Sequence, residues 1–118
     1  DRHRYLSLAT FRRSGAAVAT PVWFAAVDER LYVFTAGDSG KAKRLRASPR
    51  ARVAPCDARG NLQGEWQEAS ARLVGDAAVI RRAHLAMRDK YGWQLWLLDL
   101  GSTLTGRVKR RAWIEVTA

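Results

Sequence analysis

The segment from Gly37 to Arg44 carries the residue types of an anion-binding turn followed by a helix. Its small residues let the backbone approach a ligand closely, and Ser39 is suited to cap the helix. The first N–H groups of a capped helix present partial positive charge to a phosphate. Lys41 and Arg44 share one helix face, so both can hold the same group. The pattern predicts a phosphate site; the alternative is a capped surface helix with solvated basic residues.

Two common phosphate-binding motifs do not match this segment. A Walker loop needs four residues between its glycines and then Lys followed by Ser or Thr, whereas Gly37 and Gly40 are too close together and Ala42 follows Lys41. The dinucleotide fingerprint of three spaced glycines is also absent. A nucleotide triphosphatase and a Rossmann domain are therefore disfavoured.

The other reactive side chains form no catalytic or metal-binding pattern. His3 and His84 are the only histidines, and neither has a partner at metal-ligand spacing. His84 falls beside the apolar face of a predicted helix, where a packing role is favoured. Cys56 has no neighbouring histidine to activate it, so we interpret it as a small buried residue. The sequence singles out no catalytic residue and no metal ligand.

Composition favours one folded domain with an anionic partner. The 118 residues are 47% hydrophobic and 27% charged, with a net charge of +10. Most basic residues are arginines, a bias that a GC-rich genome also produces, and solvated faces explain the clusters Arg81-Arg82 and Lys109-Arg110-Arg111. Nucleic acid is therefore a disfavoured partner. No stretch approaches the roughly 20 apolar residues of a membrane span, and the single cysteine fits a reducing compartment, so we expect a cytoplasmic protein.

Tryptophan is abundant for a chain of this length. Such large amphipathic rings often line ligand pockets or subunit interfaces, and filling of the core is the alternative. The five are Trp23, Trp66, Trp93, Trp96 and Trp113.

Mostly β-strands must position these residues, in a single domain spanning residues 1–118. Apolar and β-branched runs predict strands over Tyr5 to Arg13, Ala17 to Val27, Leu31 to Thr35, Ala51 to Asp57, Trp66 to Val74 and Arg107 to Val116. Helices are predicted over Lys41 to Arg46, from an Asp76 cap to Gly92, and over Trp93 to Leu100, followed by a loop from Gly101 to Gly106. Pro21 cannot donate a ladder hydrogen bond, so its strand should lie at a sheet edge or a bulge. A small antiparallel barrel fits this order.

Short motifs in a fixed order extend over nearly the whole chain. They are Leu8-Ala9-Thr10-Phe11 with Gly15, Ala19 to Phe24, Thr35 with Ser39-Gly40-Lys41, Arg44-Leu45, Ala54 to Asp57 with Gly60, and Lys90-Tyr91-Gly92. With these motifs the chain resembles the pyridoxamine-phosphate-oxidase-like split-barrel family, in particular its branch that uses the deazaflavin coenzyme F420. Each motif is weak alone, but their order and spacing are fairly specific.

The resemblance implies a mainly β (α+β) fold: a six-stranded antiparallel split β-barrel with flanking helices. It also implies a homodimer with two cofactor sites, each in a groove at the subunit interface. Matching positions would lie along the cofactor ring (Thr20, Pro21, Val22 and Trp23) or hold its phosphate (Thr35, Ser39, Gly40, Lys41 and Arg44). The second subunit would contribute Trp66 and Trp113. The sequence starts at Asp1 without an initiator methionine, which suggests that leading residues, and with them one wall of the site, are missing.

The function that the resemblance implies is hydride transfer between F420 and a small conjugated or heteroaromatic substrate. Such chemistry needs no acid or base from the protein, which agrees with the missing catalytic pattern. The poly-glutamyl tail of F420 would give the +10 surface an anionic ligand. Three alternatives stay open: an FMN-binding oxidoreductase of the same fold, a non-catalytic F420 carrier, and a nucleic-acid-binding barrel.

Overall fold

The computed structural model describes residues 4–37, 39–105 and 111–117. Within these ranges the chain forms strands and helices in the order β1 (Tyr5–Phe11), β2 (Ala17–Val22), β3 (Ala25–Val27), β4 (Arg30–Ala36), α1 (Gly40–Ala47), β5 (Arg50–Cys56), β6 (Gln67–Val74), α2 (Ala77–Tyr91), α3 (Trp93–Thr105) and β7 (Arg111–Thr117). The mainly β class with flanking helices is confirmed. His3 and the cluster residues Lys109 and Arg110 lie outside the described residues.

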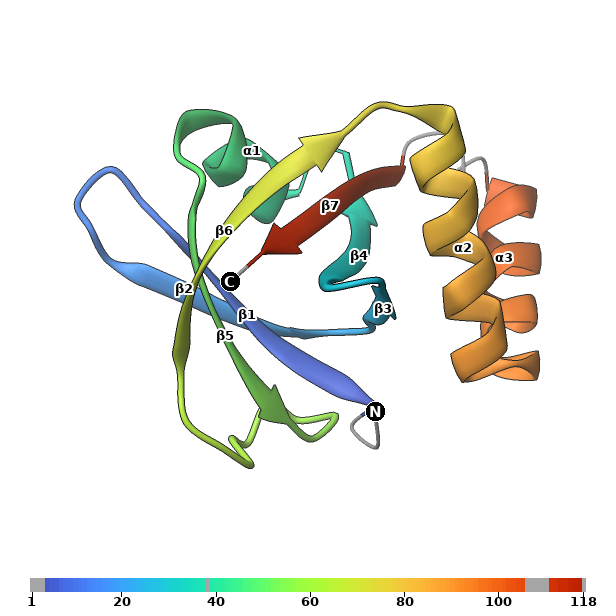
Figure 1. The fold of residues 1–118 in the computed structure, drawn as a ribbon, viewed down its shortest axis with the longest axis horizontal. Coiled ribbons are helices and arrows are strands. Elements are labelled where there is room, and N and C mark those ends of the chain that lie inside the picture. Colours follow the sequence, from blue (N-terminus) through green and yellow to red (C-terminus); the bar gives the residue numbers. More distant parts are fainter. Residues whose placement is uncertain (1–3, 38, 106–110, 118) are drawn as a thin grey trace.

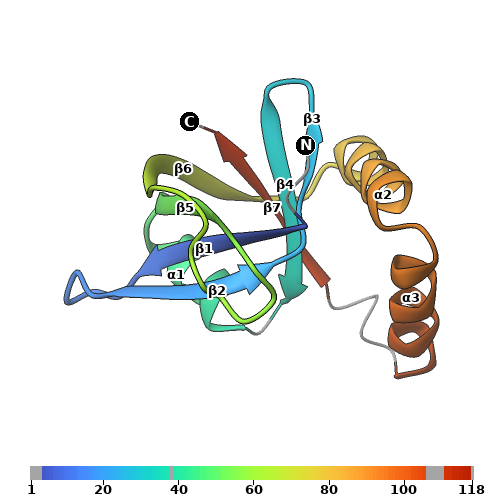
Figure 2. The ribbon, with the colours of Figure 1, turned by 90° about the horizontal axis from the view of Figure 1, so that it is seen from below.

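All seven strands belong to one antiparallel sheet with the order β2-β1-β5-β6-β7-β4-β3. The sheet curls into a half-barrel, with α1 over one end and α2 and α3 together on one side (Figures 1 and 2). Its two edge strands, β2 and β3, follow each other in the chain with only Trp23 and Phe24 between them. The chain therefore passes from one edge of the sheet to the other within two residues.

That crossing corrects the predicted number of strands from six to seven. The run from Ala17 to Val27 was predicted as one strand because it is apolar throughout. In the structure Val22 pairs with Leu6 on β1, whereas Ala25 pairs with Tyr32 on β4. The backbone must bend between these residues to exchange one partner strand for another. Pro21 lies in β2 at the sheet edge, as its missing N–H predicted.

The inside of the half-barrel is the larger apolar core. Alternate residues of each strand point inward, as the two-residue period of a strand requires. Leu45 of α1 packs against this core, so α1 covers the end of the barrel where β1 and β4 finish. The core consists of Leu6, Leu8, Val22, Phe24, Val33, Leu45, Ala51, Val53, Ala71, Ile114 and Val116.

A second core lies on the outer face of β3, β4 and β7, where α2 and α3 pack. Ala83, Met87 and Tyr91 recur at helical spacing on the buried face of α2, as their pattern predicted. Asp76 caps α2 by accepting from the N–H groups of Ala78 and Val79. Gly92 ends the helix with a φ of +57°, a conformation that favours glycine. The predicted limits of this helix are confirmed.

The last helix is longer than predicted. A loop was expected from Gly101 to Gly106, but α3 continues to Thr105. One glycine costs a helix only about 1 kcal/mol relative to alanine, and no proline follows to stop the chain. Leu104 continues the apolar repeat of Leu97 and Leu100, which favours extension. The predicted start of the last strand, residues 107–110, lies outside the described residues. In the described part of the chain, no helix is both long and apolar enough to cross a membrane.

Glu115 is a buried carboxylate on the outer face of β7. Its oxygens accept from Tyr32 Oη at 2.8 Å and Arg72 Nε at 2.9 Å, and Arg30 approaches at 3.3 Å. Burial by itself would raise the pKa of Glu115, but these hydrogen bonds and guanidinium charges lower it below its ordinary value. The charged form is therefore the one that the fold stabilises.

The Glu115→Gln variant should lose about 1–2 kcal/mol of unfolding free energy at pH 7, because a neutral amide is a weaker acceptor. A carboxyl whose pKa is lower in the folded state contributes stability above its unfolded pKa and loses it as the pH falls through the folded value. The difference in unfolding free energy between wild type and variant should therefore shrink as the pH falls below 4.5, the ordinary pKa of a glutamate. Urea unfolding at pH 7 and pH 3 measures both gaps, and equal gaps would contradict this account.

Candidate functional site

Ser39 and Thr35 form the start of the predicted phosphate site. The Ser39 Oγ accepts from the N–H of Ala42 at 3.2 Å, which confirms the predicted helix cap. Thr35, at the end of β4, donates its hydroxyl to the same oxygen at 3.2 Å. In the described part of the chain, the N–H groups of Gly40 and Lys41 have no acceptor. These two amides remain available at the first turn of α1.

Arg44 reaches from α1 back to β1. Its Nε donates to Thr10 Oγ1 at 2.6 Å, and its guanidinium passes close over Gly40. A Cβ added to Gly40 would come within 2.7 Å of a terminal nitrogen of Arg44, so the glycine makes room for the guanidinium. Sequence reasoning did not select Thr10 as a site residue. The sequence did contain a clue: Thr10 follows Leu6 and Leu8 at two-residue spacing, so it falls on the same core-facing side of the strand.

The inner face of the β1–β2 hairpin provides a second hydroxyl. Thr20 is paired with Leu8, and Thr10 is paired with Val18, so the two threonines are diagonal neighbours on one face. Thr20 Oγ1 is buried and has no hydrogen-bond partner among the described residues. A buried hydroxyl without a partner is uncommon, and a bound ligand would satisfy it. We call Thr10, Thr20, Thr35, Ser39, Gly40, Lys41 and Arg44 the α1 cradle.

The cations of the α1 cradle are not neutralised by the described part of the protein. Burial, and after it the charge of Arg44, lowers the pKa of Lys41. Burial and the charge of Arg12 likewise lower the pKa of Arg44. No described carboxylate forms an ion pair with either residue. Partly desolvated like charges without a counterion are the electrostatic condition that a bound anion relieves.

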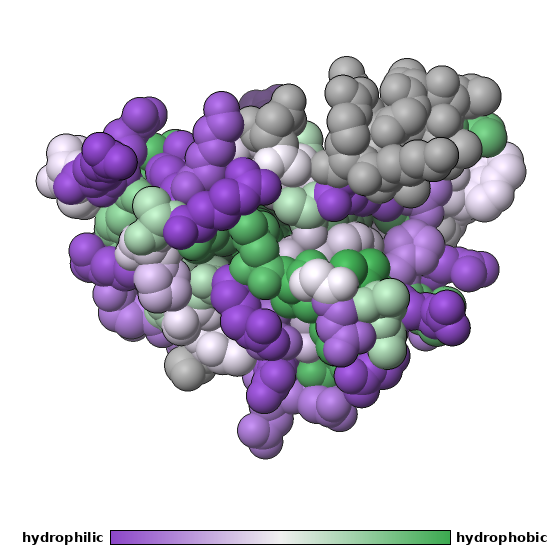
Figure 3. Space-filling model, turned by 90° about the horizontal axis from the view of Figure 1, so that it is seen from above, coloured by the Kyte–Doolittle hydropathy of each residue, from purple (hydrophilic) through white to green (hydrophobic). Residues whose placement is uncertain are grey.

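The surface over this end of the molecule is rich in hydrophilic side chains. Viewed from above Figure 1, the side on which α1 lies shows clusters of hydrophilic side chains around an apolar strip (Figure 3). Lys43 and Arg46 of α1 are exposed there, and Arg46 donates to the carbonyl of Gly37 at 3.0 Å. The helix thus adds to the positive potential around the α1 cradle.

Other predicted site residues lie apart from the α1 cradle. The Trp23 ring stacks on Tyr91 with centroids 4.4 Å apart, so it faces α2. Pro21 is exposed on the outer face of the edge strand, and Val22 is buried in the inner core. Trp113 is buried on the outer face of β7 beside Phe34. Trp66 precedes β6 and is 38% exposed. Their predicted contacts with a cofactor ring or a second subunit stay predictions.

The remaining candidate residues agree with the structural roles assigned to them. Cys56 is buried, and burial followed by the charge of Asp57 raises its pKa, so it is not an activated thiol. Arg81 and Arg82 are exposed. His84 packs edge-on against Trp113, as expected, and is also hydrogen-bonded to Asp99. Among the described residues, no group of three or more His, Cys, Asp or Glu side chains could hold a metal.

The α1 cradle contains the kinds of donor that could hold a phosphate group. Lys41 and Arg44 supply charge, the first turn of α1 supplies two N–H donors, and Thr20 supplies a hydroxyl that lacks a partner. Phosphate oxygens accept from all three kinds of donor. The described residues of the α1 cradle include no histidine or carboxylate. These donors can bind and orient an anion.

Known structures share this fold at low sequence identity. A conserved hypothetical protein from Mycobacterium tuberculosis is 22% identical, with a TM-score of 0.74, covering 99% of this chain and 74% of that one. The heme storage protein HutZ from Vibrio cholerae is 14% identical, with a TM-score of 0.72 and coverage of 98% and 82%. A NimC/NimA family protein from Clostridium acetobutylicum is 14% identical, with a TM-score of 0.59 and coverage of 98% and 71%. These similarities establish the fold alone.

Comparison with curated protein sequences found no significant relative. The profile of one protein family, described as pyridoxamine 5'-phosphate oxidase, matches residues 1–118, which is the whole chain. The half-barrel and the order of its motifs agree with that match. The chain therefore belongs to the pyridoxamine 5'-phosphate oxidase family.

Proposed function

We propose that this protein is an oxidoreductase that binds coenzyme F420 through the phosphate of the cofactor. The observation that carries the proposal is the pair Lys41 and Arg44, which lacks a described counterion. Arg44 is hydrogen-bonded to Thr10, the diagonal neighbour of Thr20, whose buried hydroxyl has no partner among the described residues. The net charge of +10 favours F420 over FMN, because the poly-glutamyl tail adds anionic groups that FMN lacks. FMN is the alternative cofactor, since its phosphate would meet the same donors.

Each part of the proposed site has a separate task. Lys41 and Arg44 hold the phosphate, and the cap formed by Ser39 and Thr35 fixes the direction of α1. The bound cofactor supplies the hydride for a small conjugated or heteroaromatic substrate. The edge strand β2, from Thr20 to Val22, provides the wall that orients the ring. Rigid positioning of this kind is the main contribution that the protein makes.

We also propose a cytoplasmic homodimer with two such sites. Trp66 is 38% exposed in the single chain, so its ring is free to cover a cofactor in the partner subunit. Trp113 is buried in its own chain, where it packs against Phe34, and it would support the site through that ring. The lone buried Cys56, which forms no disulfide, is consistent with a reducing compartment.

Cofactor titration tests the proposal. Purified protein is titrated with F420 and FMN while cofactor or tryptophan fluorescence is followed, with phosphate-free controls: riboflavin for FMN and the bare deazaflavin chromophore for F420. F420 should bind more tightly than FMN, and each phosphate-free control should bind at least about tenfold more weakly, since a charge-assisted contact contributes about 1.5–3 kcal/mol. Failure of both cofactors to bind would overturn the proposal.

A second measurement separates an enzyme from a carrier, the non-catalytic alternative. The α1 cradle contains no histidine or carboxylate, and a structural relative is a heme storage protein, so binding without turnover deserves a direct test. Reduced cofactor is mixed with quinones, enones and tetrapyrroles, and its oxidation is followed with and without protein. Acceleration by the protein supports a reductase. Tight binding without any acceleration across this panel supports a carrier.

A further inference from the structure

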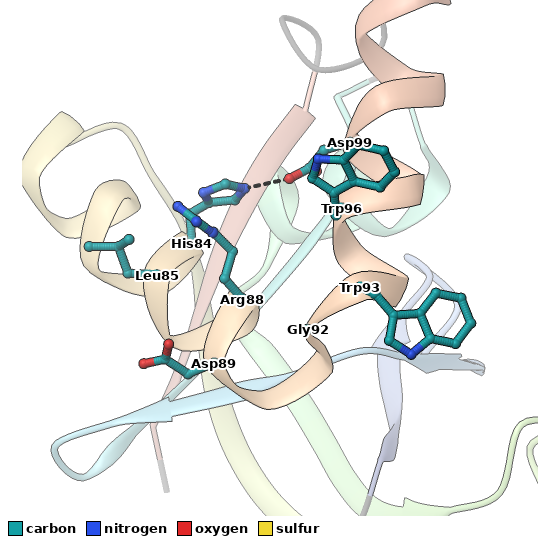
Figure 4. Close-up of a pocket in the computed structure, with 8 residues that line it drawn as sticks. All are labelled: His84, Leu85, Arg88, Asp89, Gly92, Trp93, Trp96 and Asp99. Carbon is teal, nitrogen blue, oxygen red and sulfur yellow. Dashed lines mark hydrogen bonds and ion pairs between the residues drawn. The ribbon is translucent and has the colours of Figure 1, made fainter.

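A groove runs between α2 and α3, on the side of the sheet away from the α1 cradle. Its cavity has a volume of about 500 Å³ and is lined chiefly by His84, Arg88, Trp93, Trp96 and Asp99 (Figure 4). A second hollow of about 540 Å³ shares His84 and Asp99 and extends toward Trp113. Volumes of 300–1,000 Å³ are typical of small-molecule sites. The β4–β7 pair separates this groove from the inner core.

The floor of the groove is a fixed polar bridge between the helices. His84 Nε2 on α2 lies 2.9 Å from Asp99 Oδ2 on α3, as the dashed line in Figure 4 shows. The other oxygen of Asp99 forms an ion pair with Arg111 at 2.8 Å. Arg111 is mostly buried and also lies over the Phe34 ring. Arg111 thus balances the negative charge of Asp99, and Asp99 in turn holds His84 in position in the groove.

Arg88 brings a positive charge to this groove. It rises from α2 toward His84, whereas the neighbouring Asp89 points away from it (Figure 4). No carboxylate in the described part of the chain forms an ion pair with Arg88. Because Asp99 is already paired with Arg111, the groove presents a guanidinium that can accept an external anion.

Two indoles on α3 also line the groove. Trp93 is 70% exposed and Trp96 is 63% exposed, although tryptophan is usually well buried. Trp96 projects from α3 beside Asp99, whereas Trp93, at the start of α3, points away from Arg88 (Figure 4). Indole faces stack on flat rings, and such contacts stabilise a complex beyond the burial of apolar area. An exposed indole, Trp96, in the same groove as an arginine without a described counterion favours a ligand with both a flat ring and a negative charge.

We propose that the α2–α3 groove binds a small planar aromatic carboxylate, with the carboxylate on Arg88 and the ring against Trp96. A ligand of one or two fused rings matches the volume of the cavity. The groove shares no residue with the α1 cradle, so this site does not depend on cofactor binding.

Calorimetric titration of the full chain with 2-naphthoate tests the proposal, with the neutral alcohol 2-naphthalenemethanol as the matched ligand. Arg88→Gln should weaken naphthoate binding about tenfold or more and leave binding of the alcohol nearly unchanged. Trp96→Leu should weaken both ligands. Arg82→Gln, which removes an exposed arginine of the same helix outside the groove, should change neither. Circular dichroism of each variant confirms that it is folded.

Three results would overturn the proposal. One is no naphthoate binding at millimolar concentration. A second is binding that survives Arg88→Gln but is lost in the Lys41→Ala/Arg44→Ala variant or under saturating FMN, which would place the ligand in the α1 cradle. The third is a dimer that Trp96→Glu converts to monomer in sedimentation, with no naphthoate binding in either form, which would make the groove an interface between two copies. Naphthoate binding that depends on Arg88 and persists when no flavin or deazaflavin binds would separate this site from the proposed cofactor function.

Discussion

Replacing Tyr91 with alanine is expected to lower the free energy of unfolding by about 3–5 kcal/mol, the range for truncating a buried aromatic ring. Tyr91 is 3% exposed, and its ring stacks on Trp23. Its hydroxyl accepts from the N–H of Phe24 at 3.0 Å and lies 2.7 Å from the carbonyl oxygen of Arg4. One side chain of α2 therefore holds the two residues that join β2 to β3. Chemical denaturation measures the loss.

The Tyr91→Phe variant isolates the hydroxyl from the ring. It should cost about 1–3 kcal/mol, because the buried N–H of Phe24 would lose its acceptor. Burial raises the pKa of Tyr91 to about 12, so the hydroxyl keeps its proton at neutral pH and the comparison is made there. If Tyr91→Phe were as stable as wild type, the hydroxyl would not hold the junction. If it were as unstable as Tyr91→Ala, the stacked ring would contribute nothing.

The double variant Lys41→Ala/Arg44→Ala should weaken cofactor binding by about 3–5 kcal/mol, which is roughly 10²–10⁴-fold in Kd. Both side chains lie on α1 without a described counterion, so their removal takes away charge that the fold does not itself use. Stability should change little, because loss of the hydrogen bond from Arg44 to Thr10 opposes the gain from removing two desolvated like charges. Fluorescence titration with F420 and FMN gives the binding change, and thermal unfolding gives the stability.

Two further variants control for charge and for position. Lys43→Ala removes one charge from the exposed side of the same helix and should leave Kd within about threefold, because solvent screens a distant exposed charge. Gly40→Ala keeps both charges but adds a methyl group at the place where Arg44 passes. It should weaken binding while the net charge stays constant. Equal affinity in wild type and the double variant would refute the phosphate assignment.

Local patterns were sufficient for most of the fold. The Asp76 cap, the helical repeat of Ala83 and Met87, and the Gly92 stop depend on residues close together in the sequence, and all three are confirmed. The break between Val22 and Ala25 could not be predicted, because it follows from pairing with two strands distant in the chain. The predicted end of α3 at Leu100 was wrong, because a single glycine, Gly101, does not stop a helix.

In the candidate site, too, contacts between residues close in the sequence were predictable and contacts between distant residues were not. The contacts of Ser39 with Thr35 and Ala42 join residues within one turn of chain, so local sequence could predict them. The contact between Arg44 and Thr10 joins residues 34 positions apart, and only the curl of the sheet brings them together. The sequence left open whether Trp113 fills the core, since alternation along β7 determines its face only after the neighbouring strands are known.

The crossing from β2 to β3 also bears on solubility. Exposed strand edges can pair with other chains, and proteins limit this with short edge strands and with proline. Here one edge strand, β3, has only three residues, and the other, β2, contains Pro21. Because both edges meet at Trp23 and Phe24, the packing of Tyr91 there keeps them fixed together. The junction that shapes the half-barrel thus also protects the protein against edge-to-edge aggregation.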